Sequence, residues 1–236
     1  GKKFIGPFLT LLGEILADQG NFTSAISVYK RFQRVARMAP EAPNAQKEII
    51  NLYYLTGKLP VVWKELSRFR SMYGPGSAWS RANKDIAKET QEIIKDQIIY
   101  YASLTHQKAI KDGKRRLNKE AKKGYLLFLK SYPKSKEVPG VMYLIADIEY
   151  FLKNFSQAGS YYYKIAALGK KKALRYNPVT KKFDRIHRVS SEDMVRSYVK
   201  AFEPRFKVLK KRKPNFKKPF GSITLSRFDN PSEGSF

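Results

Sequence analysis

The sequence predicts an all-α protein built from stacked helical hairpins. Residues Asn21 to Tyr29, Asn-Phe-Thr-Ser-Ala-Ile-Ser-Val-Tyr, recur in altered form as Asn154 to Tyr162, Asn-Phe-Ser-Gln-Ala-Gly-Ser-Tyr-Tyr. Each copy follows an apolar-periodic segment and a tight break, so each is expected to open the second helix of a hairpin. A fixed period in the thirties is typical of helical arrays, in which each hairpin covers the apolar face of its neighbour.

A separation of 37 residues relates further positions along the chain. It joins Gly20 to Gly57, Ala25 to Val62, Phe32 to Phe69, Ala121 to Ala158, Tyr125 to Tyr162 and Phe128 to Ile165. Between Phe69 and Phe128 the separation is 59 residues, which indicates an insertion in the third unit. The pattern therefore predicts regular hairpins at both ends of the array and an irregular one between them.

The first two hairpins are expected over residues 4–39 and 44–73. In the first, Gly13 and Ala25 are the small residues that let the two helices approach each other. Pro40 and Pro43 end this hairpin. Pro60 suits the first turn of the fourth helix, where the missing amide donor costs nothing. The glycines and proline at 74–76 then break the chain.

The third hairpin is expected over 82–132, with a helix at 82–111, a basic connector at 111–119 and a partner helix ending at Ser131. The fourth covers 139–169, and the basic stretch 170–188 is expected to form a loop or a short hairpin. Ser190 or Ser191 is expected to cap the first helix of a fifth unit at 190–204. Residues 1–204 thus form the predicted array, and 205–236 form a basic, proline-containing tail unsuited to a packed core.

The formal charge of +27 is unevenly distributed. Residues 1–100 hold 15 Lys or Arg against 9 Asp or Glu, a balance of +6, and residues 101–236 hold 32 against 11, a balance of +21. Such a field attracts polyanions or an acidic partner surface. Cysteine is absent, which excludes disulfides and thiolate metal sites and is compatible with periplasm or cytoplasm. No apolar stretch is long enough to predict a transmembrane segment.

These repeats resemble the tetratricopeptide repeat (TPR). The first copy matches that motif at Leu12, Gly13, Gly20, Phe22, Ala25, Tyr29 and Phe32, and the fourth at Ala146, Phe155, Ala158, Tyr162 and Ile165. The second copy departs at Val62, where the motif has alanine. The segment from Phe128 to Ser135 is similar to the repeat ending of bacterial periplasmic members, such as the coordinator associated with the Tol-Pal system and the outer-membrane assembly lipoproteins. The resemblance implies a right-handed α-solenoid. The start of the chain at a helix suggests an array cut from a longer protein.

In that family the first helix of each hairpin lines a concave groove that receives a peptide or a partner helix. Transferring the groove positions gives Glu14 and Asp18 in the first copy, Lys47, Asn51 and Tyr54 in the second, and Tyr143, Asp147, Tyr150 and Phe151 in the fourth. Lys47 and Asn51 also have the spacing of members that clamp a carboxylate, without matching polar partners in the next repeat. Aromatic rings with interleaved charges suit an extended peptide.

Catalytic and metal-binding patterns are absent from the sequence. His106 and His187 are 81 residues apart and lack any metal-ligand spacing, so they are interpreted as a helix-surface and a loop histidine. His187 precedes Ser190, Ser191 and Asp193, but members of a hydrolytic triad need separate scaffold positions, and a helix cap explains these residues better. We therefore expect no enzyme activity, no cofactor and no metal.

The function expected from the sequence is that of a non-catalytic scaffold that binds a protein or peptide partner, which the charge predicts to be acidic. The basic patch for such a partner comprises Lys170, Lys171, Lys172, Lys210, Lys211, Arg212 and Lys213. The basic half of the chain leaves two alternatives, a nucleic-acid binder and a protein that associates peripherally with anionic lipid through residues 205–218. The tyrosine runs 100–101 and 161–163 do not favour base stacking, because adjacent helical residues point about 100° apart. Most of these rings are expected in the core.

Overall fold

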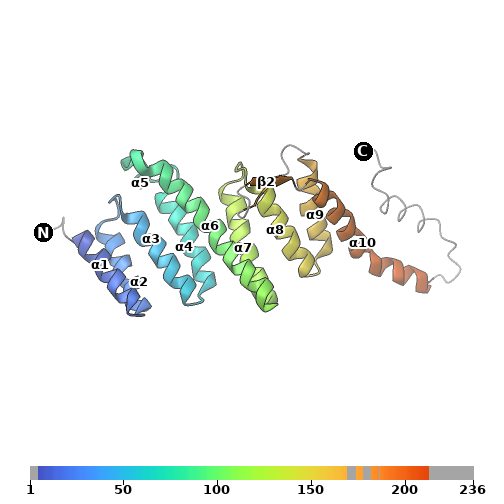
Figure 1. Cartoon of the computed structure of the whole chain (residues 1–236), viewed down its shortest axis with the longest axis horizontal. Coiled ribbons are helices and arrows are strands. Elements are labelled where there is room, and N and C mark those ends of the chain that lie inside the picture. The colour runs from blue at the N-terminus through green and yellow to red at the C-terminus, as the bar shows by residue number, and fades with distance from the viewer. Residues whose placement is uncertain (1–4, 169–173, 178–181, 186, 213–236) are drawn as a thin grey trace. The chain divides into compact units, whose positions relative to one another are not determined.

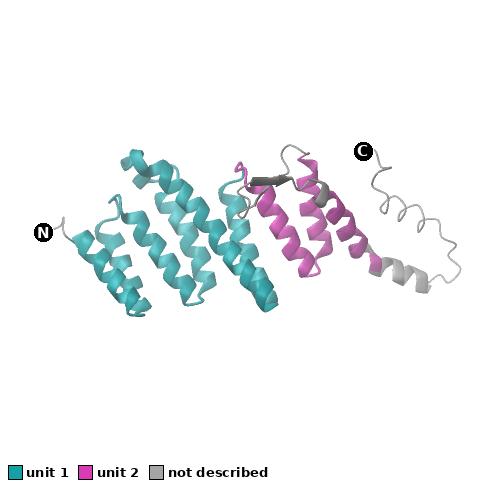
Figure 2. Ribbon diagram, viewed as in Figure 1, with its two compact units in different colours: residues 1–133 teal, residues 134–236 magenta. Residues whose placement is uncertain are grey.

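A computed structural model describes residues 5–168, 174–177, 182–185 and 187–212 (Figure 1). These residues are almost entirely helical, and their helices pack mostly as sequential antiparallel pairs. The expected all-α class is confirmed at this level, with one short β-hairpin as the exception. The chain divides into two compact units, residues 1–133 and 134–236, which Figure 2 shows in teal and magenta.

Unit 1 contains the first three hairpins predicted from the sequence. Its elements are α1 (Ile5–Asp18), α2 (Phe22–Val35), α3 (Ala42–Leu55), α4 (Leu59–Tyr73), α5 (Ala78–Ala82), α6 (Lys84–Asp112) and α7 (Arg115–Ser131). Each of α1 to α4 packs against the next, α4 packs against α6, and α6 packs against α7. The short helix α5 touches both α4 and α6 and therefore lies between the second and third hairpins.

Local sequence signals explain where these helices begin and end. The Asn21 side chain caps α2 by accepting a hydrogen bond from the Ser24 amide at 3.3 Å. Pro60 lies in the first turn of α4, as expected. The turns inside the first two hairpins place Gly20 and Gly57 at φ of 76° and 71°, a left-handed conformation that glycine adopts without a steric penalty.

The repeat period corresponds to the buried core. All four positions equivalent to Ala25 have no exposed surface, and the positions equivalent to Phe32 are at most 2% exposed. Gly13 lies so close to Tyr29 that an added Cβ would be 2.6 Å from the ring, which is the close helix approach predicted from Gly13 and Ala25. The residues that repeat in the sequence are therefore the residues that are buried in each hairpin.

Two expectations about the third unit are wrong. The sequence predicted no helix between residues 74 and 82, but Ser77 caps α5 by accepting a hydrogen bond from the Ser80 amide at 3.0 Å. The predicted basic connector at 111–119 is much shorter, because Gly113 ends α6 in a left-handed conformation and α7 begins at Arg115. Lysines and arginines tolerate helix well, so their density alone did not indicate a loop.

Unit 2 contains α8 (Val138–Phe151), α9 (Phe155–Ala167), β1 (Leu174–Asn177), β2 (Lys182–Arg185) and α10 (His187–Arg212). The strands pair antiparallel in the register Leu174 to Arg185, so the basic stretch forms the short hairpin that was one of its two expected states. Of the expected fifth unit, the described residues contain the helix α10, which packs on α9. This helix begins at His187, before the expected start near Ser190, and continues to Arg212, beyond the expected end at 204.

Candidate partner-binding groove

A groove of about 1060 Å³ lies between α1 and α3 in unit 1. The buried rings of Tyr29 and Phe32, both on α2, line its base. Glu14 and Asp18 line it from α1, one helical turn apart, as the groove positions transferred from the resemblance predicted. Asn51 of α3 also lines it. The structure therefore brings three of the expected groove residues together on one surface.

The charged side chains that line this groove are all acidic. Glu48 of α3 and Glu41, the residue before α3, face Glu14 and Asp18 of α1, and no lysine or arginine within the described residues lines the groove. Burial, together with the carboxylates of Glu48, Glu14 and Asp18, raises the pKa of the Tyr29 hydroxyl to about 12. The groove thus carries a concentrated negative field in a strongly basic chain.

Exposed leucines accompany the carboxylates. Leu11 of α1 is 56% exposed and Leu55 of α3 is 60% exposed, and both line the groove. Apolar contacts beside fixed charges suit a peptide that alternates apolar and charged side chains. The groove therefore combines negative charge with exposed apolar side chains.

Sequence reasoning missed Glu41 and Glu48. Residues 41, 44, 48, 51 and 55 repeat at three- and four-residue spacing and share one face of α3, which is the signal that could have identified them. Their distance from α1 is set only by the packing of α1 and α3 around α2. The sequence could show the face but could not show which acidic residues oppose it.

The other expected residues of the second copy lie elsewhere. Lys47 is exposed and does not line the groove. The Tyr54 ring packs on Tyr101 of α6, with their centroids 5.0 Å apart, and is half-buried there. Only Asn51 of the predicted pair Lys47 and Asn51 therefore reaches the groove, so the two side chains do not form a carboxylate clamp on this surface.

The expected residues of the fourth copy lie in unit 2 and are engaged by the chain itself. The Tyr143 hydroxyl donates a hydrogen bond to Asp193 of α10 at 2.9 Å, and its side chain is buried. The Tyr162 hydroxyl donates to Asp147 at 2.6 Å. Burial raises the pKa of Tyr162 above its usual value, and the hydrogen bond to Asp147 adds to the increase. A partner could reach Tyr143 only by displacing α10.

Tyr150 and Phe151 differ in their exposure. The Tyr150 ring packs against Phe155 of α9, and the Lys200 ammonium of α10 lies 4.9 Å from the Tyr150 ring centroid. Phe151 is 50% exposed. Of the four residues transferred to this copy, Phe151 alone presents half or more of its side chain to solvent.

Gly159 allows α10 to approach α9 closely. A Cβ added at this position would lie 3.0 Å from the ring of Tyr198, which is tighter than ordinary contact. We expect Gly159→Leu to push Tyr198 outward and to speed hydrogen exchange of the α10 amides by about tenfold or more, because overpacking typically costs 1–3 kcal/mol. Exchange followed by mass spectrometry measures this effect. Gln157→Leu, at an exposed position of the same helix, should leave α10 exchange unchanged.

The predicted basic patch falls mostly outside this description. Lys170, Lys171, Lys172 and Lys213 are not among the described residues. Lys210, Lys211 and Arg212 are the last residues of α10, and only their backbone is described. Their role as a partner surface stays a prediction.

The histidine interpretations need correction. His106 is 8% exposed, its Nδ1 lies 3.4 Å from the Tyr125 hydroxyl, and burial lowers its pKa. It is a core residue because α7 covers that face of α6. His187 is the first residue of α10, not a loop residue.

Of the tyrosine runs, Tyr101 and Tyr162 are buried, whereas Tyr100 and Tyr163 are more than half exposed.

Within the described part of the chain, no group of three or more His, Asp or Glu is arranged to hold a metal ion. Over the same residues, none of the helices combines the length and apolar character needed to cross a membrane.

Comparison of the sequence with models of known protein families found no match. Comparison with curated proteins found no match either.

Proposed function

We propose that the protein is a non-catalytic scaffold of TPR-like hairpins, arranged as a right-handed α-solenoid, that binds a segment of a protein partner. The observation that carries the proposal is the groove between α1 and α3, where four carboxylates and two exposed leucines line one open surface. In this respect it resembles the peptide grooves of the TPR family. A groove of this kind suits recognition of a chain segment better than bond-making chemistry.

The carboxylates of the groove favour a bound segment with positive charge. The net charge of the whole chain predicted an acidic partner, but an acidic segment in this groove would face Glu14, Asp18, Glu41 and Glu48. Like charges brought together at an interface weaken binding. For the groove we therefore propose a segment that carries lysine or arginine between apolar residues. An acidic partner is proposed only for the basic stretches at 170–172 and 210–213.

Binding of a lysine–leucine peptide tests this proposal. A fluorescent peptide of alternating lysine and leucine should bind the full chain, although both carry net positive charge. Replacing two groove carboxylates, Glu14→Gln with Glu48→Gln, should weaken binding by about tenfold, since exposed ion pairs contribute up to about 1 kcal/mol each. Fluorescence anisotropy at fixed salt measures the Kd.

The matched control changes the same number of charges outside the groove. Asp85→Asn with Glu89→Gln alters two exposed carboxylates of α6 and should change the Kd by less than twofold. Asn51→Ala should weaken the groove complex by roughly 1–3 kcal/mol if the amide holds the peptide backbone. Equal affinity of the peptide for the wild-type chain and the Glu14/Glu48 variant would remove the groove from the proposal.

A further inference from the structure

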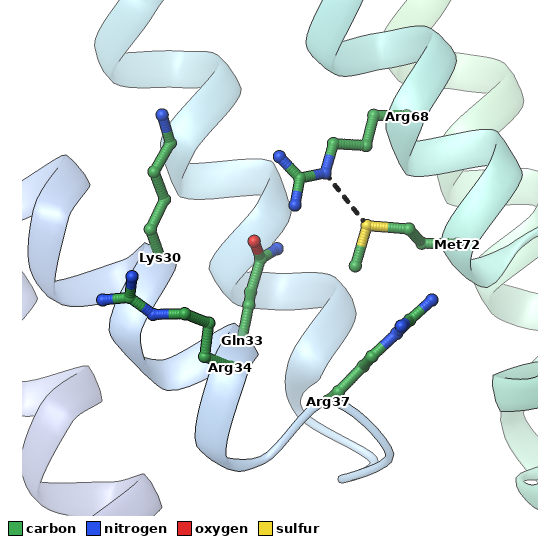
Figure 3. Close-up of a pocket in the computed structure, with 6 residues that line it drawn as sticks. All are labelled: Lys30, Gln33, Arg34, Arg37, Arg68 and Met72. Carbon is green, nitrogen blue, oxygen red and sulfur yellow. Dashed lines mark hydrogen bonds between the residues drawn. The ribbon is translucent and has the colours of Figure 1, made fainter.

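A second cavity lies between α2 and α4 in unit 1 and has the opposite charge. Its volume is about 560 Å³. Figure 3 shows the side chains that line it, which come from α2, the turn after it and α4: Lys30, Gln33, Arg34, Arg37, Arg68 and Met72. Four of these six side chains are cationic and none is acidic. It is distinct from the groove, because α2 contributes Tyr29 and Phe32 to the groove but different residues to this cavity.

The cations in this cavity lack charged partners within the described part of the chain. Arg68 Nε donates to the Met72 sulfur at 3.2 Å, and a thioether is a weak acceptor. Lys30 Nζ donates to the Tyr53 hydroxyl at 2.9 Å. Arg34 and Arg37 make no ion pair with the described residues. Four like charges around one hollow repel one another, and a bound anion would relieve that repulsion.

The base of the cavity is a rigid polar side chain. Gln33 is only 4% exposed, and its Nε2 donates to Gln46 at 2.7 Å. Gln46 in turn donates to the Glu65 carboxylate at 2.9 Å. Glu65 is buried and does not line the cavity, so its charge is held on the core side of this chain of hydrogen bonds. The arrangement holds Gln33 in place without putting a carboxylate among the arginines.

Tyr73 adds a buried hydroxyl near the same arginines. Burial raises the pKa of Tyr73 to about 12, against the opposing effects of Arg37, Arg68 and the Gln33 side chain. Gln33 and the two arginines therefore surround this hydroxyl, which lies behind the side chains that line the cavity.

The alternative to a ligand site is a solvated cationic surface, which explains fewer of these observations. It accounts for exposed arginines on one helix, but not for cations from two hairpins that surround a hollow with a buried Gln33 at its base. The volume lies in the range of small-molecule sites, although the polar lining excludes an apolar ligand. Guanidinium forks match phosphate oxygens in bidentate geometry. We propose that this cavity binds a small ligand with clustered phosphate groups.

Methionine methyl NMR can test the site with inorganic tripolyphosphate as the probe. The chain has 4 methionines, and Met72 lines the cavity. The Met72 signal, assigned with Met72→Leu, should shift and saturate as tripolyphosphate is added to the full chain. Met142, in the other unit, should not move. This readout separates the cavity from anion binding to the basic C-terminal stretch.

Variants make the test specific. Arg37→Gln with Arg68→Gln should weaken the Met72 response by at least about tenfold, since hydrogen bonds to charged groups are the strong ones. Arg31→Gln, an exposed arginine of α2 that does not line the cavity, should change it by less than twofold. Unshifted Met142 and Met194 signals in each variant show that unit 2 is unchanged, and circular dichroism checks helix content.

Four outcomes would overturn the proposal. The first is no Met72 shift with tripolyphosphate, and the second is an equal response in the double variant and the wild type. The third is a response to citrate as strong as that to tripolyphosphate, which would show a site for clustered carboxylates. A single-stranded oligonucleotide that moves Met72 at lower concentration than tripolyphosphate would also overturn it, in favour of nucleic acid.

Discussion

Trp79→Ala is expected to lower the free energy of unfolding of unit 1 by about 3–5 kcal/mol, the largest effect of any single change considered. Trp79 is 1% exposed, and its indole Nε1 donates to the Ala39 carbonyl at 2.8 Å. Its ring also makes an edge contact with Tyr73 at a centroid distance of 5.5 Å. Alanine would leave a cavity, remove the ring contact and remove one of the two donors to the Ala39 carbonyl, which would keep the Ala42 amide.

Tryptophan fluorescence can follow this loss directly. The chain has 2 tryptophans, Trp63 and Trp79, and both lie in unit 1, so Trp63 still reports unfolding of that unit in the variant. Urea denaturation gives the free energy by linear extrapolation. Trp79→Phe keeps most of the packing but loses the hydrogen bond, and should cost about 1–2 kcal/mol. A loss below about 1 kcal/mol for Trp79→Ala would show that α5 is not anchored through this ring.

Gln46→Leu is expected to cost about 3 kcal/mol or more. Gln46 has no exposed surface and joins Gln33 to Glu65 through the hydrogen bonds described above. Leucine has a similar size but cannot donate or accept, so one buried amide and one buried carboxylate would lose their partner. An unsatisfied buried group costs about 1–3 kcal/mol, and more when it is charged.

Replacing the whole polar chain provides the control for that variant. The combined change Gln33→Leu, Gln46→Leu and Glu65→Leu removes every group that Gln46→Leu leaves unpaired. A buried polar cluster exchanged for apolar residues is often neutral in stability. The triple variant should therefore be more stable than Gln46→Leu alone, as urea denaturation would measure. Additive losses in the three positions would contradict the hydrogen-bonded network.

The repeat pattern predicted the core because burial follows helix periodicity. Phe32, Phe69 and Phe128 are all buried at equivalent positions, although Phe128 follows an insertion. Val62 stands where the first and fourth copies have Ala25 and Ala158, and it is still fully buried, so the larger side chain occupies the same core position. Apolar residues at helical spacing therefore predict buried positions even where the residue type varies.

Irregular elements were harder to predict. The five-residue helix α5 is too short to show a period, and its anchor Trp79 lies between a glycine-rich break and a long helix. Lys153 takes a left-handed conformation, with φ of 66°, at a turn where the other copies have Gly20 and Gly57. The lysine side chain disfavours that conformation, so the residue type did not indicate it.

By itself, the sequence determined the helical class, the hairpin boundaries of the first, second and fourth pairs, and the residues that fill the core. These features depend on the spacing of apolar side chains within each helix, and that spacing is a property of the local sequence. Tertiary structure alone decided that Glu14 and Asp18 face Glu41 and Glu48, that four cations surround the cavity between α2 and α4, and that α10 engages Tyr143. Charge at a surface depends on which polar faces become neighbours, and neighbours are set by the packing of helices distant in sequence.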